Sequence, residues 1–324
     1  MERAALAVVA LIGVPLATCG YIILAERLIR VLPGRRQQAI RPWLWLAPAL
    51  VLLTVFLVYP SLHTIVLSLY DAGSNNFVGL QNYVGIFTDG GTLIALRNNV
   101  IWLVVFTSAT VSLGLVVAVL TDRVPYENVA KAIVFLPMAI SFVAASVIWK
   151  FVYDYRPPGE SQTGLLNAVL TGVVPGFPPQ AWIINAPWNN LALIVVGIWV
   201  WTDFCMVILS ASLKGIPKDL LEAARVDGAN EWAIFRLVTV PLISSTIAVV
   251  TTTMIIFALK AFDIVYVMTS GNYDTDVIAN RMYTEMFNFN DFGRAAAIAV
   301  ILLAAIVPVM LGNIQRFRQQ EERR

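Results

Sequence analysis

Few side chains in this sequence could carry out covalent chemistry. It contains one histidine, His63, which lies in a long apolar stretch where a packed or pore-facing side chain is expected, and it has no pair of imidazoles for a metal ion. Its two cysteines, Cys19 and Cys205, both fall in apolar segments, which favours packed thiols over a disulfide or redox site. No lysine stands in the G-x-x-x-x-G-K-[ST] pattern that cradles nucleotide phosphates. We therefore expect no enzyme active site, no metal site and no cofactor bound by this chain.

Charged side chains inside long apolar segments are better candidates for a site. Lys260 and Asp263 stand three residues apart in the apolar stretch 243–268. Because charge inside a membrane is costly, such residues usually mark a cavity or a solute pathway. The spacing predicts that both lie on one helix face, where they can pair, with Tyr266 farther along the same face. The alternative is a buried pair that only packs helices together.

The preceding apolar stretch brings aromatic and polar groups to a similar depth. It contains Trp199, Trp201, Thr202, Asp203 and Met206. Aromatic faces beside hydrogen-bonding groups suit sugar rings, which have apolar faces and hydroxyl edges. These residues therefore indicate a pathway for a sugar-like solute. The alternative is that the tryptophans anchor a helix in lipid or pack in its core.

A charged loop of unusual length separates these two apolar stretches. The run Glu222-Ala223-Ala224-Arg225-Val226-Asp227-Gly228 lies in a segment of about 30 residues, 214–243, which also contains Pro241. Helix formers, a central glycine and a proline stop predict an ordered helical insert. Its charges of both signs indicate a docking surface for a soluble partner. The alternative is an amphipathic surface helix with no partner.

Composition places the chain in a membrane. Hydrophobic residues make up 59% of it and charged residues only 13%, too few to cover a soluble globule. The net charge of +2 gives no reason to expect a nucleic-acid partner. About seven stretches reach the roughly 20 apolar residues of a membrane-crossing helix: 4–24, 43–68, 99–121, 130–153, 190–213, 243–268 and 294–314. These runs are continuous, unlike the alternating strands of a barrel, so we predict an all-α integral membrane protein.

The basic residues predict the orientation of these helices. If seven spans alternate, most of the 22 Lys and Arg residues fall on one side: Arg27, Arg30, Arg35, Arg36, Arg41, Arg123, Lys131, Lys214, Lys218, Arg225, Arg236, Arg316, Arg318, Arg323 and Arg324. The positive-inside rule then places the amino terminus outside, and the carboxyl terminus and the segment 214–243 in the cytoplasm. We expect Arg35, Arg36 and Arg41 to contact anionic membrane lipid.

The first apolar stretch could be a targeting signal or a retained helix. Leu16-Ala17-Thr18-Cys19 has some similarity to a lipoprotein cleavage site. However, the residues before it carry no net positive charge, and the apolar run continues past Cys19 to Leu24. We therefore expect a retained helix with its amino end outside.

The charged loop resembles the signature of binding-protein-dependent ABC importer permeases, E-A-A followed by three residues, G, nine residues and I-x-L-P. Glu222-Ala223-Ala224, Gly228 and Val238-Thr239-Val240-Pro241 match this pattern in register, with valine in place of isoleucine and leucine. Tyr59-Pro60 and Phe77-Val78-Gly79-Leu80-Gln81-Asn82-Tyr83 resemble segments of the sugar-type members. The similarity is to the larger, maltose-type permease of a pair.

The resemblance covers the chain from Trp43 onward and implies its organisation. Residues 43–324 would form a six-helix permease core with the coupling loop at 214–243. Residues 1–42 would be an extra helix and a basic cytoplasmic linker. The bacterial or archaeal inner membrane would hold the chain. The implied partners are a second, similar permease, a cytoplasmic ATPase dimer that binds ATP and magnesium, and an extracytoplasmic substrate-binding protein.

Roles for individual residues also follow from the resemblance. Glu222, Ala223, Ala224, Arg225, Asp227, Gly228 and Pro241 would form the ATPase-coupling segment, with Gly228 at a sharp turn and Pro241 before the next span. Sugar-contact positions of the family correspond to Gly197, Val200, Trp201, Phe204 and Lys260. Together with the polar groups noted above, the expected substrate pathway is Gly197, Val200, Trp201, Thr202, Asp203, Phe204, Lys260, Asp263 and Tyr266.

Several functions remain open from the sequence. The leading expectation is the permease subunit of an ABC importer for a sugar, an oligosaccharide or a glycoside. Glycerol phosphate or a polyamine is an alternative solute. A secondary transporter would favour internal repeats, which the sequence lacks, and a seven-helix receptor leaves the signature loop unexplained. The Pro- and Gly-rich segment 154–189, with a short amphipathic helix at 164–170, would contact the binding protein or only cap the helices.

Overall fold

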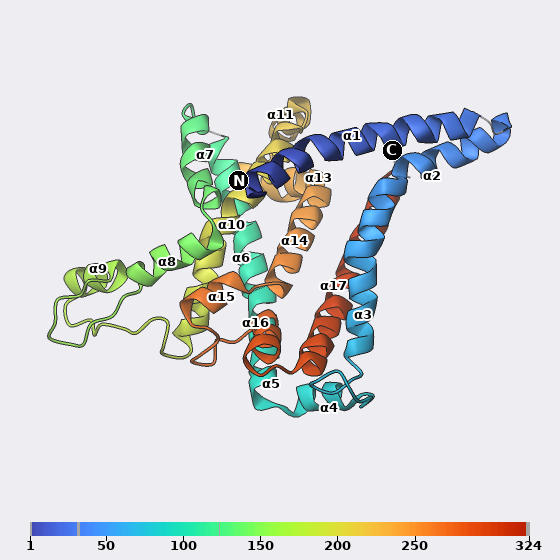
Figure 1. Ribbon diagram of the computed structural model, residues 1–324. Coiled ribbons are helices and arrows are strands. Elements are labelled where there is room, and N and C mark those ends of the chain that lie inside the picture. The colour runs from blue at the N-terminus through green and yellow to red at the C-terminus, as the bar shows by residue number, and fades with distance from the viewer. Residues whose placement is uncertain (1, 31–32, 123, 322–324) are drawn as a thin grey trace. The chain divides into compact units, whose positions relative to one another are not determined.

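The computed structural model describes residues 2–30, 33–122 and 124–321, and these residues are largely helical (Figure 1). Two β-bridge partners, Tyr70 and Phe77, form an isolated antiparallel pair. The chain divides into two compact units, Met1–Val66 and Leu67–Arg324. The expected boundary at residue 42 stays a prediction. Arg123, Arg323 and Arg324, which entered the orientation prediction, lie outside the described residues.

The first unit contains a helical hairpin. Helix α1 (Glu2–Arg30) pairs with α2 (Gly34–Leu53), after which the chain continues through a π-helical turn, η1 (Thr54–Val58), into α3 (Tyr59–Leu67). Arg41 donates two hydrogen bonds to the carboxylate of Glu26, at 2.8 and 3.0 Å. The lipid contact expected of Arg41 stays a prediction, and the ion pair with Glu26 joins α1 to α2 inside the hairpin.

The second unit contains most of the helices. Their bounds are α4 Gln81–Thr88, α5 Gly90–Ile101, η2 Trp102–Phe106, α6 Thr107–Thr121, α7 Glu127–Phe135, η3 Leu136–Ala139, α8 Phe142–Val152, α9 Leu165–Val173, α10 Trp188–Lys214, α11 Lys218–Val226, α12 Glu231–Ile234, η4 Phe235–Thr239, α13 Val240–Leu242, α14 Ser244–Leu259, α15 Asp263–Met268, α16 Ile278–Tyr283, η5 Thr284–Asn288 and α17 Phe292–Glu321. The short helix expected at 164–170 is α9.

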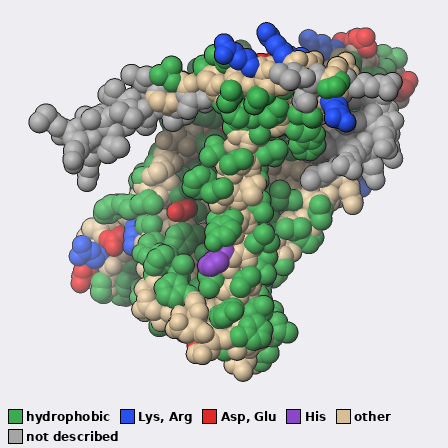
Figure 2. Space-filling view, turned by 45° about the vertical axis from the view of Figure 1, so that its right-hand side comes forward, with side chains coloured by type: hydrophobic (Ala, Val, Ile, Leu, Met, Phe, Trp, Pro, Cys, Tyr) green, Lys and Arg blue, Asp and Glu red, His purple; other side chains and the backbone are tan. Residues whose placement is uncertain are grey.

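Within the described residues, four continuous helices are long and apolar enough to cross a membrane: Arg36–Leu67, Gly90–Thr121, Trp188–Lys214 and Phe292–Asn313. Two bent helix pairs raise the number of spans to six if each pair crosses once. The expected count of seven is therefore not confirmed. The first expected span, 4–24, lies within α1 and is not among these candidates. Hydrophobic side chains dominate the molecular face in Figure 2, as lipid contact requires.

The expected continuous span at 130–153 is instead a bent pair. Glu127–Ala139 and Phe142–Val152 meet at an angle of 100°. Pro137 cannot donate a backbone hydrogen bond, and the chain tightens there into the 3₁₀ turn η3. Ser141 then begins a new helix, since its side chain accepts a hydrogen bond from the backbone of Ala144. These two residues explain why one apolar run forms two helices.

Close packing of α6 and α10 forms the centre of the second unit, with α14 beside them (Figure 1). Gly114 makes this approach possible, because a Cβ atom there would lie 2.4 Å from the Cβ of Cys205 and 3.0 Å from the backbone nitrogen of Met206. Met206, Leu209 and Met254 fill the adjoining core and are fully buried. Small residues allow such close helix contacts in membranes, where burial in lipid offers little additional driving force.

Replacing Gly114 with alanine should therefore destabilise the second unit. The added methyl group meets backbone as well as side-chain atoms, so the two helices must separate, at a cost of roughly 1–3 kcal/mol. We expect a lower midpoint of thermal unfolding in detergent. Gly172→Ala in α9 is the matched control, since nothing lies within 4 Å of its added Cβ. A midpoint for Gly114→Ala equal to that of the control would contradict the predicted contact.

A cluster of ion pairs fastens the segment α16–η5. The Arg281 guanidinium lies 3.2 Å from Asp89 and 2.9 Å from Glu285, and Arg294 of α17 lies 3.4 Å from Asp89. Burial alone would raise the pKa of Asp89, but hydrogen bonds from Thr92 and the two guanidinium charges hold it below its usual value. The carboxylate thus stays charged at neutral pH and joins the start of α5 to α16 and α17.

Candidate functional site

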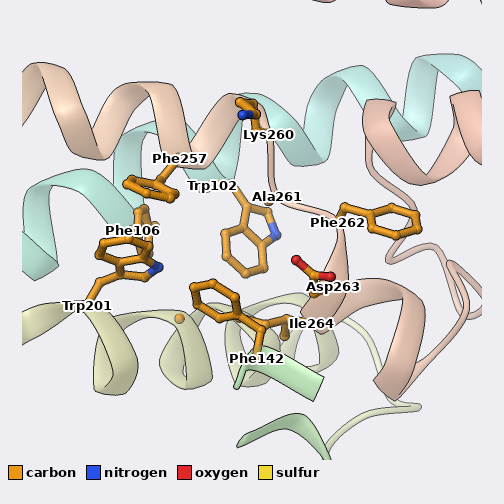
Figure 3. Close-up of a pocket in the computed structure, with 11 residues that line it drawn as sticks. Trp102, Phe106, Phe142, Trp201, Phe257, Lys260, Ala261, Phe262, Asp263 and Ile264 are labelled. Carbon is orange, nitrogen blue, oxygen red and sulfur yellow. The ribbon is translucent and has the colours of Figure 1, made fainter. Parts of the chain in front are cut away.

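A cavity of about 180 Å³ lies beside the middle of α10 (Figure 3). Its lining comes from four parts of the second unit: Trp102, Phe106, Phe142, Gly197, Trp201, Phe257, Lys260, Ala261, Phe262, Asp263 and Ile264. We call this cavity the aromatic pocket. Trp201 and Phe262 lie toward opposite ends of it, with Asp263 nearer Phe262 (Figure 3). The wall is mostly aromatic, and Lys260 and Asp263 supply its charged groups.

An interruption between α14 and α15 forms one wall of the aromatic pocket. Helix α14 ends at Leu259, where its last carbonyl groups have no partner within the helix. The side-chain amide of Asn99 donates to the carbonyl oxygens of Ala258 and Leu259, each at 3.3 Å. Its oxygen accepts a hydrogen bond of 2.7 Å from the backbone of Ile278. Asn99 therefore stabilises the interruption that turns residues 260–262 toward the cavity.

The expected helix-face pairing of Lys260 and Asp263 is wrong. Lys260 caps the end of α14 and Asp263 begins α15, so no common helix contains them. Among the described residues no salt bridge joins the two side chains. The three-residue spacing predicts a shared face only where the helix is continuous. Both residues nevertheless line the aromatic pocket, and Lys260 is exposed.

Ring contacts order the aromatic wall. The Trp201 and Phe257 centroids lie 3.6 Å apart, and Phe142 stacks on Trp201 at 5.7 Å. Across the cavity, the indole nitrogen of Trp102 donates to Asn190 at 3.1 Å, which fixes the plane of the ring. A Cβ on Gly197 would lie 3.1 Å from Trp102, so glycine there leaves room for the ring. The cavity thus offers fixed apolar faces with polar groups at their edge.

Four of the nine expected pathway residues line the cavity: Gly197, Trp201, Lys260 and Asp263. Phe204 packs edge-on against Trp201, and Tyr266 stacks on Phe262, so both adjoin it. Thr202 instead donates its hydroxyl to the backbone of its own helix, at the carbonyl of Ile198. None of these three is part of the cavity wall.

Val200 and Asp203 lie in the packed interior of the second unit. Val200 is 2% exposed and Asp203 is 0% exposed. Neither carboxylate oxygen of Asp203 has a hydrogen-bond partner among the described residues. A solute in the aromatic pocket cannot reach either side chain in this conformation. Both positions share α10 with Trp201 but are not among the residues that line the cavity.

The sequence reasoning missed most of the aromatic lining. Trp102 and Phe106 are four residues apart in an apolar run directly after Asn98-Asn99. Two aromatic residues at i, i+4 next to two asparagines could have predicted an aromatic helix face that lines a site. Phe142 and Phe262 gave no such signal. Each becomes part of the lining only because a helix is interrupted next to it.

The signature segment forms two helices joined by a tight turn. Helix α11 (Lys218–Val226) contains Glu222, Ala223 and Ala224, and Gly228 follows with φ +82°. This left-handed conformation is strained for any residue with a Cβ atom. The side chain of Asn230 then accepts a hydrogen bond from the backbone of Ala233 and begins α12. The turn thus lies where the sequence predicted it.

An ion pair bridges the turn. Arg225 of α11 donates to Glu231 of α12 at 3.0 Å, and both side chains are about half exposed. Below them lies a cavity of about 480 Å³ whose lining includes Leu221, Leu213 and Val119. The segment therefore rests on the ends of α6 and α10. Pro241 lies in α13, before the 71° bend that leads into α14.

The outer face of this segment is exposed and partly apolar. Glu222, Ala223 and Asp227 are exposed, and Val226 is 87% exposed. Trp232 and Leu237 are also largely exposed, at 68% and 71%. We call residues 218–242 the docking segment. An ordered helix pair that carries both acidic and large apolar side chains outward has the composition of an interaction surface.

Residues 110–318 match the protein family described as "Binding-protein-dependent transport system inner membrane component". This match includes the docking segment and all of α10 and α14. It covers more than half of the chain. The family description agrees with the resemblance identified from the signature pattern.

Characterised relatives extend the similarity over a larger part of the chain. The "osmoprotective compounds uptake permease protein GgtC" of Synechocystis sp. is 58% identical over 281 residues, which are 87% of this chain and 100% of the relative. The "alpha-glucoside transport system permease protein AglF" of Rhizobium meliloti is 51% identical over 282 residues, which are 87% of this chain and 83% of the relative.

A solved structure has a similar fold. It is a bacterial ABC transporter involved in the import of the acidic polysaccharide alginate, 24% identical to this chain, with a TM-score of 0.74. The match covers 88% of this chain and 99% of that chain. At this level of identity the similarity concerns the fold, which is that of an ABC importer permease.

Proposed function

The chain belongs to the family of binding-protein-dependent transport system inner membrane components, and on that basis we propose that it forms half of the translocation pathway of an ATP-driven importer for a neutral sugar or glycoside. As a permease subunit, it is not itself an enzyme. The observation that supports the solute class is the aromatic pocket, where Trp201 and Phe257 form a wall beside Lys260 and Asp263. Fixed ring faces with polar groups at the edge fit the two kinds of surface on a sugar.

The size of the aromatic pocket supports a shared pathway. Its volume of about 180 Å³ is below the roughly 300–1,000 Å³ of typical ligand sites. A second, similar permease would complete the site from the other side. The relative named for alpha-glucosides agrees with a small glycoside as solute. An extracytoplasmic binding protein would deliver it.

The docking segment is the proposed contact with a cytoplasmic ATPase dimer. Glu222 and Asp227 offer exposed carboxylates, while the small Ala223 leaves that face of α11 open to close approach. The Arg225–Glu231 pair would make α11 and α12 move together. ATP and magnesium would be bound by the partner, and no cofactor by this chain. Closure of the ATPase dimer would then move α10 and α14 through their connections to the segment.

We also propose an orientation in the bacterial or archaeal inner membrane. The docking segment and the carboxyl terminus would face the cytoplasm and the amino terminus the outside, as the distribution of Lys and Arg favours. Residues 1–42 would add a helix outside the six-helix core. The segment 154–189, which contains α9, would face outward and contact the binding protein.

An anionic solute such as glycerol phosphate is the second candidate, because Lys260 is exposed at the aromatic pocket. A variant with Lys260→Gln separates the two. Glutamine keeps a hydrogen-bond donor but removes the charge, so uptake of a neutral glycoside should stay within about threefold of wild type. Uptake of a phosphate ester should fall by at least about tenfold, since hydrogen bonds to charged groups contribute roughly 1.5–3 kcal/mol.

The experiment uses proteoliposomes that contain this chain, its partner permease, the ATPase and the binding protein. Initial uptake rates are measured with ATP inside, for an α-glucoside, a β-galactoside, glycerol phosphate and a polyamine. Glycoside uptake by both wild type and Lys260→Gln would support the proposal. Uptake of glycerol phosphate alone, lost in Lys260→Gln, would replace it with the anionic alternative. Uptake of a polyamine alone would overturn both.

A further inference from the structure

A cluster of aromatic rings continues from the aromatic pocket along α15 and α16. Phe262, which lines the pocket, stacks on Tyr266 with centroids 5.1 Å apart and planes at 18°. Tyr283 contacts both Phe262, at 5.5 Å, and Tyr266, at 4.9 Å and edge-on, and Phe287 follows Tyr283 at 4.8 Å. We call these four residues the aromatic ladder. Figure 3 shows its first ring, Phe262, at one end of the pocket, and Figure 1 shows α15 and α16.

The aromatic ladder is accessible over its length. Tyr266 is 39% exposed and Phe287 is 60% exposed, and the other two rings are partly exposed. The hydroxyls of Tyr266 and Tyr283 lie 3.3 Å apart, so one donates to the other and a hydrogen-bonding edge accompanies the ring faces. This contact raises the pKa of the Tyr283 hydroxyl above its ordinary value, which is already well above physiological pH. None of the four side chains carries a charge.

The opposite face of the same segment explains why the rings are fixed. Tyr283 and Phe287 are four residues apart, and Arg281 and Glu285 repeat that spacing two positions earlier, so the pairs lie on opposite sides. Arg281 and Glu285 form the ion-pair cluster with Asp89, and Glu285 is 2% exposed. The cluster holds one side of α16–η5 while the other presents rings. A surface ordered in advance loses little entropy when a ligand binds.

We propose that the aromatic ladder is a second sugar-binding surface, against which a glycoside packs the apolar faces of its rings as the solute approaches the aromatic pocket. This inference rests on the proposed function and specifies its solute as a glycoside of more than one ring. Three features carry it: the continuity with the pocket through Phe262, the partly exposed rings that extend past Tyr283 to Phe287, and the hydroxyl pair of Tyr266 and Tyr283. A neutral, amphipathic solute matches all three.

Cysteine protection in the reconstituted importer tests whether a glycoside lies on the ladder. The background variant is Cys19→Ser, which removes the exposed native thiol and leaves the buried Cys205 in place. Phe287→Cys is then reacted with a polar maleimide, with and without a trisaccharide α-glucoside and its binding protein. Phe289→Cys is the matched control, because Phe289 is 61% exposed in the same stretch of chain and does not belong to the ladder.

We expect the trisaccharide, held by the three remaining rings, to slow the reaction at Phe287→Cys by at least about threefold and not at Phe289→Cys. Equal rates with and without solute would overturn the proposal. A Phe287→Cys thiol that reacts in the isolated subunit but not in the assembled importer would also overturn it, because a partner would then cover the ladder.

Uptake gives a second readout and separates the two proposals. Phe287→Ala should slow trisaccharide uptake by roughly three- to tenfold and monosaccharide uptake far less, because only the longer solute reaches both the aromatic pocket and the last ring. Phe287→Tyr should restore the rate. If wild type transports glycosides but Phe287→Ala slows both solutes equally or not at all, the ladder is refuted and the proposed function stands. If wild type transports no glycoside, both fail.

Discussion

Replacing Gly228 with valine is expected to abolish solute-stimulated ATP hydrolysis by the assembled importer while the protein stays inserted and folded. The backbone at this position has φ +82°, which a β-branched residue tolerates poorly. Strain of this kind costs roughly 1–3 kcal/mol, and each 1.4 kcal/mol or so changes an equilibrium tenfold. The turn would relax and shift α12 relative to α11. We therefore expect stimulated hydrolysis and uptake to fall together by at least about tenfold.

Gly79→Val provides the matched control for this result. Gly79 has φ +60°, and an added Cβ there would meet only the Phe77 ring, at 3.9 Å, so the substitution imposes a similar backbone strain. It lies far along the chain from the docking segment. Stimulated hydrolysis should remain near wild type in Gly79→Val. If both variants lost it equally, general destabilisation and not the coupling turn would explain the effect.

A different result is expected at the aromatic pocket: Trp201→Ala should nearly abolish uptake while ATP hydrolysis continues. Trp201 contacts Phe142, Phe204 and Phe257, so its removal takes away the centre of the ring wall. Burial of such a side chain against a ligand contributes roughly 1.5–3 kcal/mol. The weakened pocket would then compete poorly with the binding protein for the solute. The amount of glycoside moved per ATP should therefore fall by at least about tenfold.

Two variants control for the pocket result. Trp201→Phe keeps a ring face and should retain most of the uptake. Trp43→Ala removes a tryptophan from α2, where it is 66% exposed and does not line the aromatic pocket. Uptake by this variant should stay near wild type. Equal losses in Trp43→Ala and Trp201→Ala, or full uptake in Trp201→Ala, would contradict the assignment of the pocket.

The sequence was sufficient for the features that depend on local pattern. Apolar length identified α6, α10 and α17 as parts of candidate membrane spans, because each helix must satisfy its own backbone in lipid. The spacing from Glu222 to Gly228 placed a turn between two helices, and Gly228 has the expected left-handed backbone. The family was recognisable from the same residues. These features require no knowledge of distant contacts.

The features that the sequence left hidden depend on interrupted helices. The bend at Pro137–Ser141 and the interruption at 260–262 both occur inside apolar runs long enough to cross a membrane. At the second of these, the partner that stabilises the interruption is Asn99, about 160 residues earlier in the chain. A hydropathy pattern does not identify which distant side chain will bond to the end of a helix. The helix-face argument for Lys260 and Asp263 failed for this reason, and the aromatic lining went unnoticed with it.

The most direct measurement is ATP-dependent accumulation of a labelled α-glucoside in proteoliposomes that contain the four kinds of subunit. We expect accumulation against a gradient only when ATP, the binding protein and an intact docking segment are all present. With the Gly228→Val variant, accumulation should fall by at least about tenfold. Accumulation driven by an ion gradient without ATP, or equal accumulation with Gly228→Val, would contradict the claim that this chain is a passage coupled to a separate ATPase.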